Sequence, residues 1–253
     1  MTRGTYRWSC RAGTPLLLPY LARRQPESTE PSTVMVRVKI CGITNADDAH
    51  LAVACGADAV GVLVGQRHPS PDFVSTDDAK AIFAGLPPFV TSTFVTHEDD
   101  PARVADLISI VCPSVLQVHS ELQPSDCAAL KRQFDRIRII KSYHVTGPES
   151  LDYGYRYIGT VDAFLLDSKN LTTGQVGGTG LIHDWNLSAA IVQRYRLPVV
   201  LAGGLTPGNV EAAIARVRPF GVDVNSGVKA AINRRKDANK MREFIRRAKS
   251  VDT

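Results

Sequence analysis

Short apolar runs alternate with longer amphipathic stretches from residue 36 to the end of the chain. Eight of the runs are almost continuously apolar, which is typical of parallel strands that helices cover on both faces. We predict strands at Val36–Ile40, Ala59–Val64, Phe89–Val95, Ser114–Val118, Ile137–Lys141, Ala163–Leu166, Pro198–Leu201 and Gly221–Val224.

Most of these runs are followed by a stretch with helical spacing of its apolar residues. We predict helices at Asn45–Cys55, Thr76–Ala84, Pro101–Ile110, Pro124–Phe134, Trp185–Arg194, Pro207–Val217 and Asp237–Ala248. Gly56 is a stop signal for the first helix, and three of the others begin with proline, which suits a first turn. The pattern around 148–158 is only weakly helical.

Eight strand–helix units in about 215 residues predict a single (β/α)8 barrel over residues 35–253. The alternative is a doubly wound open sheet, which would need a glycine-rich fingerprint after its first strand. The sequence there is Lys39-Ile40-Cys41-Gly42, so the barrel is favoured.

Residues 1–34 differ from the rest in composition, with five arginines, two glutamates and several prolines, serines and threonines. We interpret them as a disordered extension, or as sequence upstream of a translation start at Met35. An organellar targeting leader is the alternative.

The composition excludes several classes of protein. Of the 253 residues, 44% are hydrophobic and 22% charged, as in globular domains, and no apolar run reaches the roughly 18 residues of a membrane span. Much of the net charge of +5 comes from residues 1–34, and we assign the basic residues 234–236 and 246–247 to a solvated last helix. We therefore expect no nucleic-acid partner and no membrane partner. The five cysteines are scattered without a CxxC pair, so we expect neither disulfides nor zinc, and a cytoplasmic location.

In a barrel of this kind, the chemistry lies where the strands end. The polar or glycine residues at those positions are Lys39, Cys41, Arg67, His68, Gln117, His119, Lys141, Asp167, Gly203, Gly204, Asp223, Asn225, Ser226 and Gly227.

Glycines are concentrated after the sixth, seventh and eighth strands, at 177–180, 203–204 and 227. Glycine lets backbone N–H groups approach an anion, and a short helix after the eighth strand would present its positive end there. Each glycine group alone fits a tight turn equally well. All three together indicate a phosphate site.

Cys41 and Asp167 stand on different sides of the expected barrel mouth. A thiol and a carboxyl placed there could act on two faces of one small sugar, with Lys39 close enough to tune the thiol. A buried, chemically inert cysteine fits the same spacing. Spacing alone leaves both interpretations open.

Six motifs in order resemble the phosphoribosylanthranilate isomerase family, and the resemblance runs from Met35 to the last helix. They are Lys39-Ile40-Cys41-Gly42-Ile43-Thr44, Gly56-Ala57-Asp58-Ala59-Val60-Gly61, Leu165-Leu166-Asp167, Gly177-Gly178-Thr179-Gly180 with Asp184-Trp185, Leu201-Ala202-Gly203-Gly204-Leu205 and Gly221-Val222-Asp223-Val224-Asn225-Ser226-Gly227-Val228.

The resemblance implies an Amadori rearrangement of N-(5'-phosphoribosyl)anthranilate in tryptophan synthesis, without metal or cofactor, by a monomer or homodimer. It implies that Asp167 is the general acid and Cys41 the general base, so the pKa of Asp167 should be raised and that of Cys41 lowered. It further implies that the substrate contacts Gly178, Gly203, Gly204, Asp223, Ser226 and Gly227.

The chain departs from the family pattern after the second strand, where Ser70-Pro71-Asp72 replaces Ser-Pro-Arg. The resemblance assigns that arginine to the anthranilate carboxylate, which an aspartate would repel. Arg67 or His68 could supply the cation instead, and an Asp72→Arg change would then improve binding. Asn225 and Lys229 also replace the usual Ser and Glu.

Two other functions remain open on this evidence. The first is an isomerase of a different N-substituted phosphoribosylamine, whose aglycone carries an amine or amide that suits Asp72. The second is a non-catalytic sugar-phosphate-binding protein, against which the presence of both Cys41 and Asp167 speaks.

Overall fold

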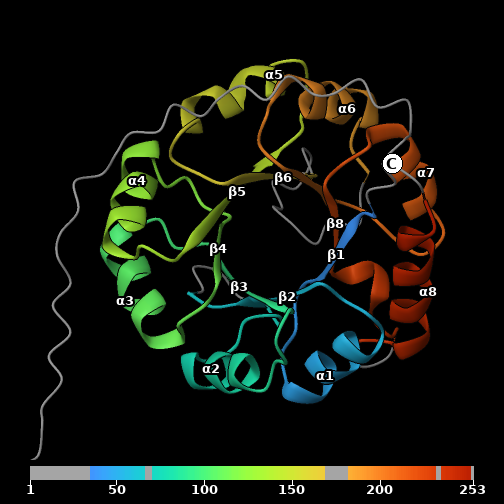
Figure 1. Cartoon of the computed structure of the whole chain (residues 1–253), viewed down its shortest axis with the longest axis horizontal. Helices are drawn as coiled ribbons and strands as arrows, with labels where there is room; N and C mark the ends of the chain where they lie inside the picture. Colours follow the sequence, from blue (N-terminus) through green and yellow to red (C-terminus); the bar gives the residue numbers. More distant parts are fainter. Residues whose placement is uncertain (1–34, 66–69, 169–181, 232–234, 252–253) are drawn as a thin grey trace, which may run out of the picture. The chain divides into compact units, whose positions relative to one another are not determined.

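A computed structural model describes residues 35–65, 70–168, 182–231 and 235–251. Within them, eight parallel strands pair in chain order and close into a barrel, with β1 also pairing β8. The strands are β1 (Arg37–Ile40), β2 (Ala59–Leu63), β3 (Thr91–Thr96), β4 (Val115–Val118), β5 (Arg138–His144), β6 (Ala163–Asp167), β7 (Val199–Leu201) and β8 (Gly221–Val224). Figure 1 shows them as an inner ring with the helices around it. The predicted (β/α)8 barrel is confirmed, and an open sheet is wrong.

The helices lie close to their predicted positions. They are α1 (Ala46–Ala54), α2 (Thr76–Ala84), α3 (Pro101–Val111), α4 (Pro124–Gln133), α5 (Ser150–Tyr153), α6 (Trp185–Arg194), α7 (Val210–Val217) and α8 (Ala238–Lys249), with short 3-10 helices η1 (Gly154–Tyr157) and η2 (Ser226–Val228). The weak pattern around 148–158 corresponds to α5 and η1. The side chains of Asn45, Ser75 and Asp100 accept first-turn N–H groups, which explains where α1, α2 and α3 begin.

Two boundaries differ from the prediction in ways that matter for the site. Pro207 lies in a turn before α7, because Asn209 ties that turn together by bonding Thr206 N and Gly204 O. Strand β5 continues past Lys141 to His144. Residues 142–144 are largely polar, so an apolar pattern could not reveal the end of this strand.

Lys141 therefore lies inside the barrel wall and not at its mouth. Its side chain is buried, and Nζ donates to the carbonyl oxygens of Ser120 at 2.9 Å and Ser142 at 2.6 Å. Burial lowers the pKa of Lys141 to about 8. His144 takes its place as the polar residue at the end of β5.

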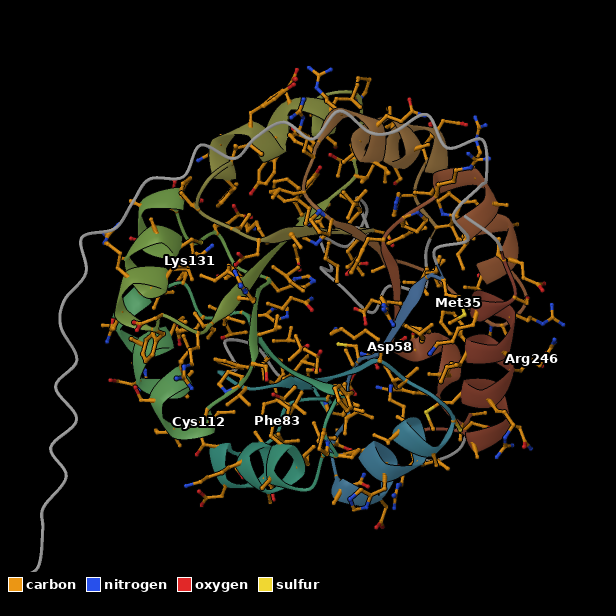
Figure 2. The ribbon with its side chains drawn as sticks, viewed as in Figure 1. Met35, Asp58, Phe83, Cys112, Lys131 and Arg246 are labelled. Carbon is orange, nitrogen blue, oxygen red and sulfur yellow. The ribbon has the colours of Figure 1, made fainter. Side chains whose placement is uncertain are left out.

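The outer surface of α8 carries charged side chains, as Figure 2 shows for Arg246. Arg246 and Arg247 both pair with Glu243 on the same helix, as expected for a solvated last helix. Among the residues that the structure describes, none of the helices has the length and apolar character to cross a membrane.

Candidate active site

Cys41, Lys39 and Asp223 form a buried cluster where β1 and β8 end. Lys39 lies opposite Asp223 in the strand register, and its Nζ donates to Asp223 Oδ1 at 3.0 Å. Gly61 on β2 provides the space: a Cβ there would lie 2.8 Å from Cys41 Sγ and 2.9 Å from Lys39 Nζ. The structure thus brings together three residues that the sequence analysis had singled out.

The protonation of this cluster differs from the expectation. Burial raises the pKa of the Cys41 thiol, and the ammonium of Lys39 offsets this only in part. Burial also acts to lower the pKa of Lys39, but the charge of Asp223 and its hydrogen bond help to outweigh burial, and the pKa of Lys39 is raised. The predicted lowering of the Cys41 pKa is wrong, because burial removes the water that would solvate a thiolate.

Asp167 ends β6 and is held by two hydrogen bonds. Its Oδ1 accepts from Ser168 N at 2.7 Å, and its Oδ2 lies 3.3 Å from His119 Nε2. Burial acts to raise the pKa of Asp167, but the hydrogen bond and charge of His119 outweigh it and lower the pKa. The predicted rise in the pKa of Asp167 is wrong, because the sequence placed His119 at a strand end without showing that it faces Asp167.

A row of rings extends from His119 along the barrel mouth. His97 stacks on His119 with ring centroids 4.7 Å apart, and Phe73 meets the edge of His97 at 5.6 Å. His144 lies on the other side of His119, at 5.4 Å. Sequence reasoning missed both histidines because their strands end later than the apolar pattern does: His97 directly follows β3, and His144 is the last residue of β5.

Among the described residues, His119, His144 and Asp167 form a group of side chains that could hold a metal ion, with ligand atoms all within 4.8 Å of one another. Two of these atoms, His119 Nε2 and Asp167 Oδ2, lie 3.3 Å apart and form the hydrogen bond described above. The proximity of this pair is therefore explained without a metal.

The predicted phosphate residues gather where β7 and β8 end. Gly203 and Gly204 have φ angles of 78° and 66°, which favour glycine, and a Cβ at Gly203 would lie 3.1 Å from Asp167 Oδ1. Ser226 and Gly227 open η2, and a Cβ at Gly227 would lie 2.0 Å from the carbonyl oxygen of the β7 loop residue Leu205. Only glycine permits this approach of the two loops. Two further predicted contacts, Gly178 and Arg67, lie outside the described residues, as does His68.

Asp72 faces cations of its own chain. Lys229 Nζ pairs with Asp72 Oδ1, and Asn225 Nδ2 donates to Asp72 Oδ2 at 2.9 Å. Burial acts to raise the pKa of Asp72, but these bonds outweigh it and lower the pKa. Asp72 is thus an anion already neutralised by Lys229, and the structure removes the argument that it would repel a carboxylate of the ligand.

Lys236 is another residue that sequence reasoning misplaced. It precedes α8 and is only 6% exposed, so it does not belong to a solvated helix face. Its Nζ donates to Asn225 at both the carbonyl oxygen (3.1 Å) and Oδ1 (3.0 Å). Its position in a basic run disguised it, since only the fold shows that Lys236 lies opposite Lys229 in an antiparallel bridge. Arg234, assigned to the same helix, lies outside the described residues.

A small apolar cluster, separate from the main core, lies beside Cys41. It consists of Cys41, Leu63 and Val95, with Phe73 packed against it. Phe73 is held there by a bridge to Leu63 at the end of β2. These side chains offer a surface for a flat apolar group next to the thiol.

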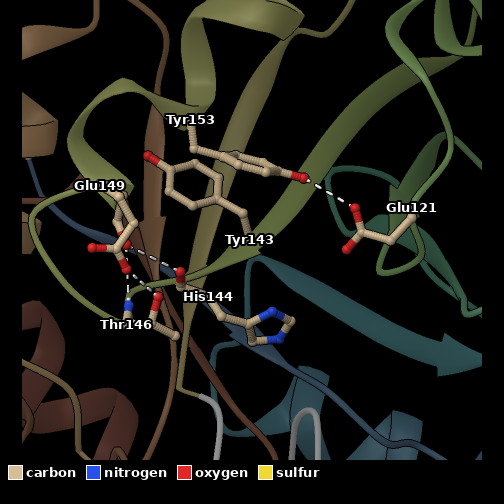
Figure 3. Close-up of a pocket in the computed structure, with 7 residues that line it drawn as sticks. Glu121, Tyr143, His144, Thr146, Glu149 and Tyr153 are labelled. Carbon is tan, nitrogen blue, oxygen red and sulfur yellow. Dashed lines mark hydrogen bonds between the residues drawn. The ribbon is translucent and has the colours of Figure 1, made fainter.

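A cavity of about 190 Å³ lies at the end of β5. As Figure 3 shows, Tyr143, His144, Thr146, Glu149 and Tyr153 line it, with Glu121 opposite Tyr153. Tyr153 Oη donates to Glu121 Oε2 at 3.4 Å. His144 joins this cavity to the group around Asp167.

Comparisons with known proteins agree with this geometry. The family model described as N-(5'-phosphoribosyl)anthranilate (PRA) isomerase matches residues 38–247. An N-(5'-phosphoribosyl)anthranilate isomerase of Methanosarcina mazei is 41% identical over 85% of this chain and 95% of its own length. The enzyme of Geobacter sulfurreducens is 43% identical over 85% of this chain and 99% of its own length.

Solved structures of the same family share the fold. The N-(5'-phosphoribosyl)anthranilate isomerase of Pyrococcus furiosus superposes with a TM-score of 0.72 and 30% identity, covering 85% of this chain and all of that one. A phosphoribosylanthranilate isomerase in complex with reduced 1-(o-carboxyphenylamino)-1-deoxyribulose 5-phosphate has a TM-score of 0.69 and 36% identity, covering 86% and 100%. The chain therefore belongs to the N-(5'-phosphoribosyl)anthranilate isomerase family.

Proposed function

We propose that this chain converts N-(5'-phosphoribosyl)anthranilate to 1-(2-carboxyphenylamino)-1-deoxyribulose 5-phosphate, in the cytoplasm and without metal or cofactor. One observation carries the proposal: Cys41 and Asp167 lie where two strands of the closed barrel end at its mouth, and each is buried beside a basic side chain. Cys41 lies beside Lys39, and Asp167 beside His119. A sugar-phosphate-binding protein would need neither pair.

Asp167 is the general acid of the first step. Its carboxyl proton passes to the ring oxygen of the ribose, the bond from C1 to that oxygen breaks, and the nitrogen lone pair forms a Schiff base at C1. The pKa of Asp167 is lowered, so its carboxylate must first gain a proton to become the reactive form. His119 Nε2, 3.3 Å from Oδ2, is placed to deliver it.

Cys41 is the general base of the second step. Its thiolate takes the proton from C2, the electron pair moves toward nitrogen, and the resulting enolamine tautomerises to the ketone. Lys39 stabilises the thiolate that this step requires, since it is the strongest opposing influence on the buried thiol. Burial disfavours the Cys41 thiolate, and the hydrogen bond of His119 disfavours protonated Asp167.

The remaining predicted contacts are assigned as follows. Backbone N–H groups of Gly203, Gly204, Ser226 and Gly227 hold the phosphate, and Gly178 is a further substrate contact that the family resemblance implies. Asp223 faces the ribose while it fixes Lys39. Arg67 is the loop cation that the sequence offers to the aglycone.

The test is turnover of freshly generated phosphoribosylanthranilate by the full chain, followed by loss of anthranilate-type fluorescence. We expect Asp167→Asn and Cys41→Ser each to lower kcat by about 10²- to 10⁴-fold, the usual contribution of general acid–base catalysis. Asp135→Asn and Cys112→Ser are matched controls on exposed residues and should retain full activity. If both site variants stayed fully active, the assigned mechanism would be wrong.

An isomerase of a different N-substituted phosphoribosylamine is the second candidate. It depended on Asp72 as a lone anion in the aglycone site, and the ion pair with Lys229 removes that basis. Turnover of the anthranilate compound at kcat/KM of about 10⁴ M⁻¹s⁻¹ or more would exclude it.

A further inference from the structure

Two buried ammonium groups lie at the ends of one hydrogen-bonded chain beside Cys41. The chain runs from Lys229 to Asp72, from Asp72 to Asn225, and from Asn225 to Lys236. All four residues are fixed by the fold. Asp72 is anchored at the end of β2 through the neighbouring Phe73, Asn225 lies against Gly42, and Lys229 and Lys236 face each other in an antiparallel bridge.

The charges around Cys41 do not balance. Lys39, Lys229 and Lys236 are buried there, and two aspartates, Asp72 and Asp223, oppose them. Lys39 pairs with Asp223 and Lys229 with Asp72, whereas Lys236 Nζ donates to two oxygens of the uncharged Asn225. Burial and the charge of Lys229 lower the pKa of Lys236 to about 8. An anion between the ammonium groups of Lys229 and Lys236 would offset the excess positive charge and raise the pKa of Lys236 again.

The position of this series of hydrogen bonds determines which anionic group of the substrate can reach Lys229 and Lys236. The phosphate residues lie after β7 and at the start of η2, while Lys229 extends away from them to Asp72 at the end of β2. Phe73, next to Asp72, belongs to the apolar cluster of Cys41, Leu63 and Val95. Because Cys41 acts on C2 of the sugar, the aryl group on C1 would lie on this apolar surface, with its carboxylate toward the lysines.

We propose that Lys229 and Lys236 bind the carboxylate of the substrate's N-aryl group, and that Asp72 and Asn225 are positioning residues that hold the two ammonium groups. This proposal rests on the proposed function, which needs a cation for the carboxylate of the substrate. It assigns that role to Lys229 and Lys236, after β8, and not to Arg67, after β2. Asp72, which replaces an arginine of the family pattern, then keeps a role as the anchor of the relocated cation.

The experiment is a binding cycle that does not require turnover. The probes are reduced 1-(o-carboxyphenylamino)-1-deoxyribulose 5-phosphate and the same reduced compound made from aniline, which lacks the carboxyl group. Calorimetry with the full chain should show that the wild type prefers the carboxylated probe by about 10- to 100-fold, the worth of a charge-assisted hydrogen bond. Lys229→Met should abolish most of that preference and leave the affinity for the aniline compound unchanged.

A second variant separates binding from folding. Lys229→Met leaves Asp72 buried without its cation, so Asp72→Asn/Lys229→Met removes both charges together and avoids that penalty. It should fold with the thermal midpoint of the wild type and still lack the preference. Lys80→Met, on the exposed face of α2, is the matched control and should retain it.

The outcomes are distinct. If the folded double variant keeps the preference, or if Arg67→Met alone abolishes it, the lysine pair is not the carboxylate site. If Lys229→Met lowers the affinity for both probes equally, Lys229 and Lys236 bind the phosphate and the proposal fails. If the wild type binds neither probe, the proposed function itself is wrong.

Discussion

The two sides of the barrel mouth use different chemistry to control one proton each. Around β8, β1 and β2, buried ammonium groups lie near Cys41. The charge of Lys39 favours the thiolate, whereas burial disfavours it. Around β4, β5 and β6, stacked imidazoles lead to Asp167, and a hydrogen bond from His119 favours the carboxylate. Lys39 and Lys229 on the first side form ion pairs with Asp223 and Asp72, whereas an unperturbed imidazole exchanges protons near neutral pH. The base thus lies on the side of the ion pairs, and the acid on the side where protons can be resupplied.

The largest effect in this comparison should come from Lys39→Met. Without the ammonium the thiolate loses its main support, so kcat should fall by about 10²- to 10³-fold, within the range of acid–base catalysis. The pKa of Cys41 should rise further, which the pH dependence of its alkylation would show. Lys39→Met/Asp223→Asn, which leaves no uncompensated carboxylate, is the control for folding. Unchanged alkylation in a folded variant would show that Lys39 does not act on Cys41.

Asp72→Arg should rank next, in the direction opposite to the one expected from the sequence. The guanidinium would stand between Lys229 and Lys236, so KM should rise by about 10- to 100-fold from like-charge repulsion and lost positioning. Asp72→Arg/Lys229→Glu reverses the pair and should recover most of the loss. Steady-state kinetics and thermal midpoints check both variants, and an Asp72→Arg enzyme with improved KM would restore the sequence-based expectation.

Gly61→Ala should have a smaller effect, confined to the lysine side. The added methyl would meet Cys41 Sγ and Lys39 Nζ, and such overpacking costs about 1–3 kcal/mol. We expect kcat to fall by about tenfold for that displacement, while the phosphate affinity stays the same. Gly208→Ala is the matched control, since its nearest neighbour would be an ordinary 3.7 Å away. Equal effects at both glycines would argue against a crowded Cys41–Lys39 cluster.

His119→Gln should have the smallest effect on rate and a clear effect on pH dependence. In the wild type, His119 lowers the pKa of Asp167, so removing its charge should raise that pKa. The acid limb of kcat/KM against pH should move to higher pH, while kcat at its optimum changes by less than about tenfold. Gln keeps a donor, which limits the loss to the charge and the exchangeable proton. A limb that does not move would mean that another group sets the pKa of Asp167.

Much of the fold and part of the site could be predicted from the sequence. Strand-length apolar runs, first-turn prolines such as Pro101 and Pro124, and the stop signal Gly56 are local signals, so helices and strands came within a few residues of their observed ends. Lys39, Cys41, Asp167, Gly203 and Asp223 were recognised because a closed barrel places every strand end at one mouth. His144 was missed because polar residues end β5, and Lys236 because its run of basic residues resembles a solvated helix.

Protonation and pairing were decided by the tertiary structure. The sequence by itself determined the order of strands and helices, the barrel that they form, and which residue types stand at its mouth, because these follow from short-range periodicity. Only the fold decided that Lys229 neutralises Asp72, that His119 faces Asp167, and that burial raises the pKa of Cys41. Asp72 and Lys229 are more than 150 residues apart in the chain. A pKa depends on every charge and every excluded water molecule nearby, and these come from segments that no local pattern relates.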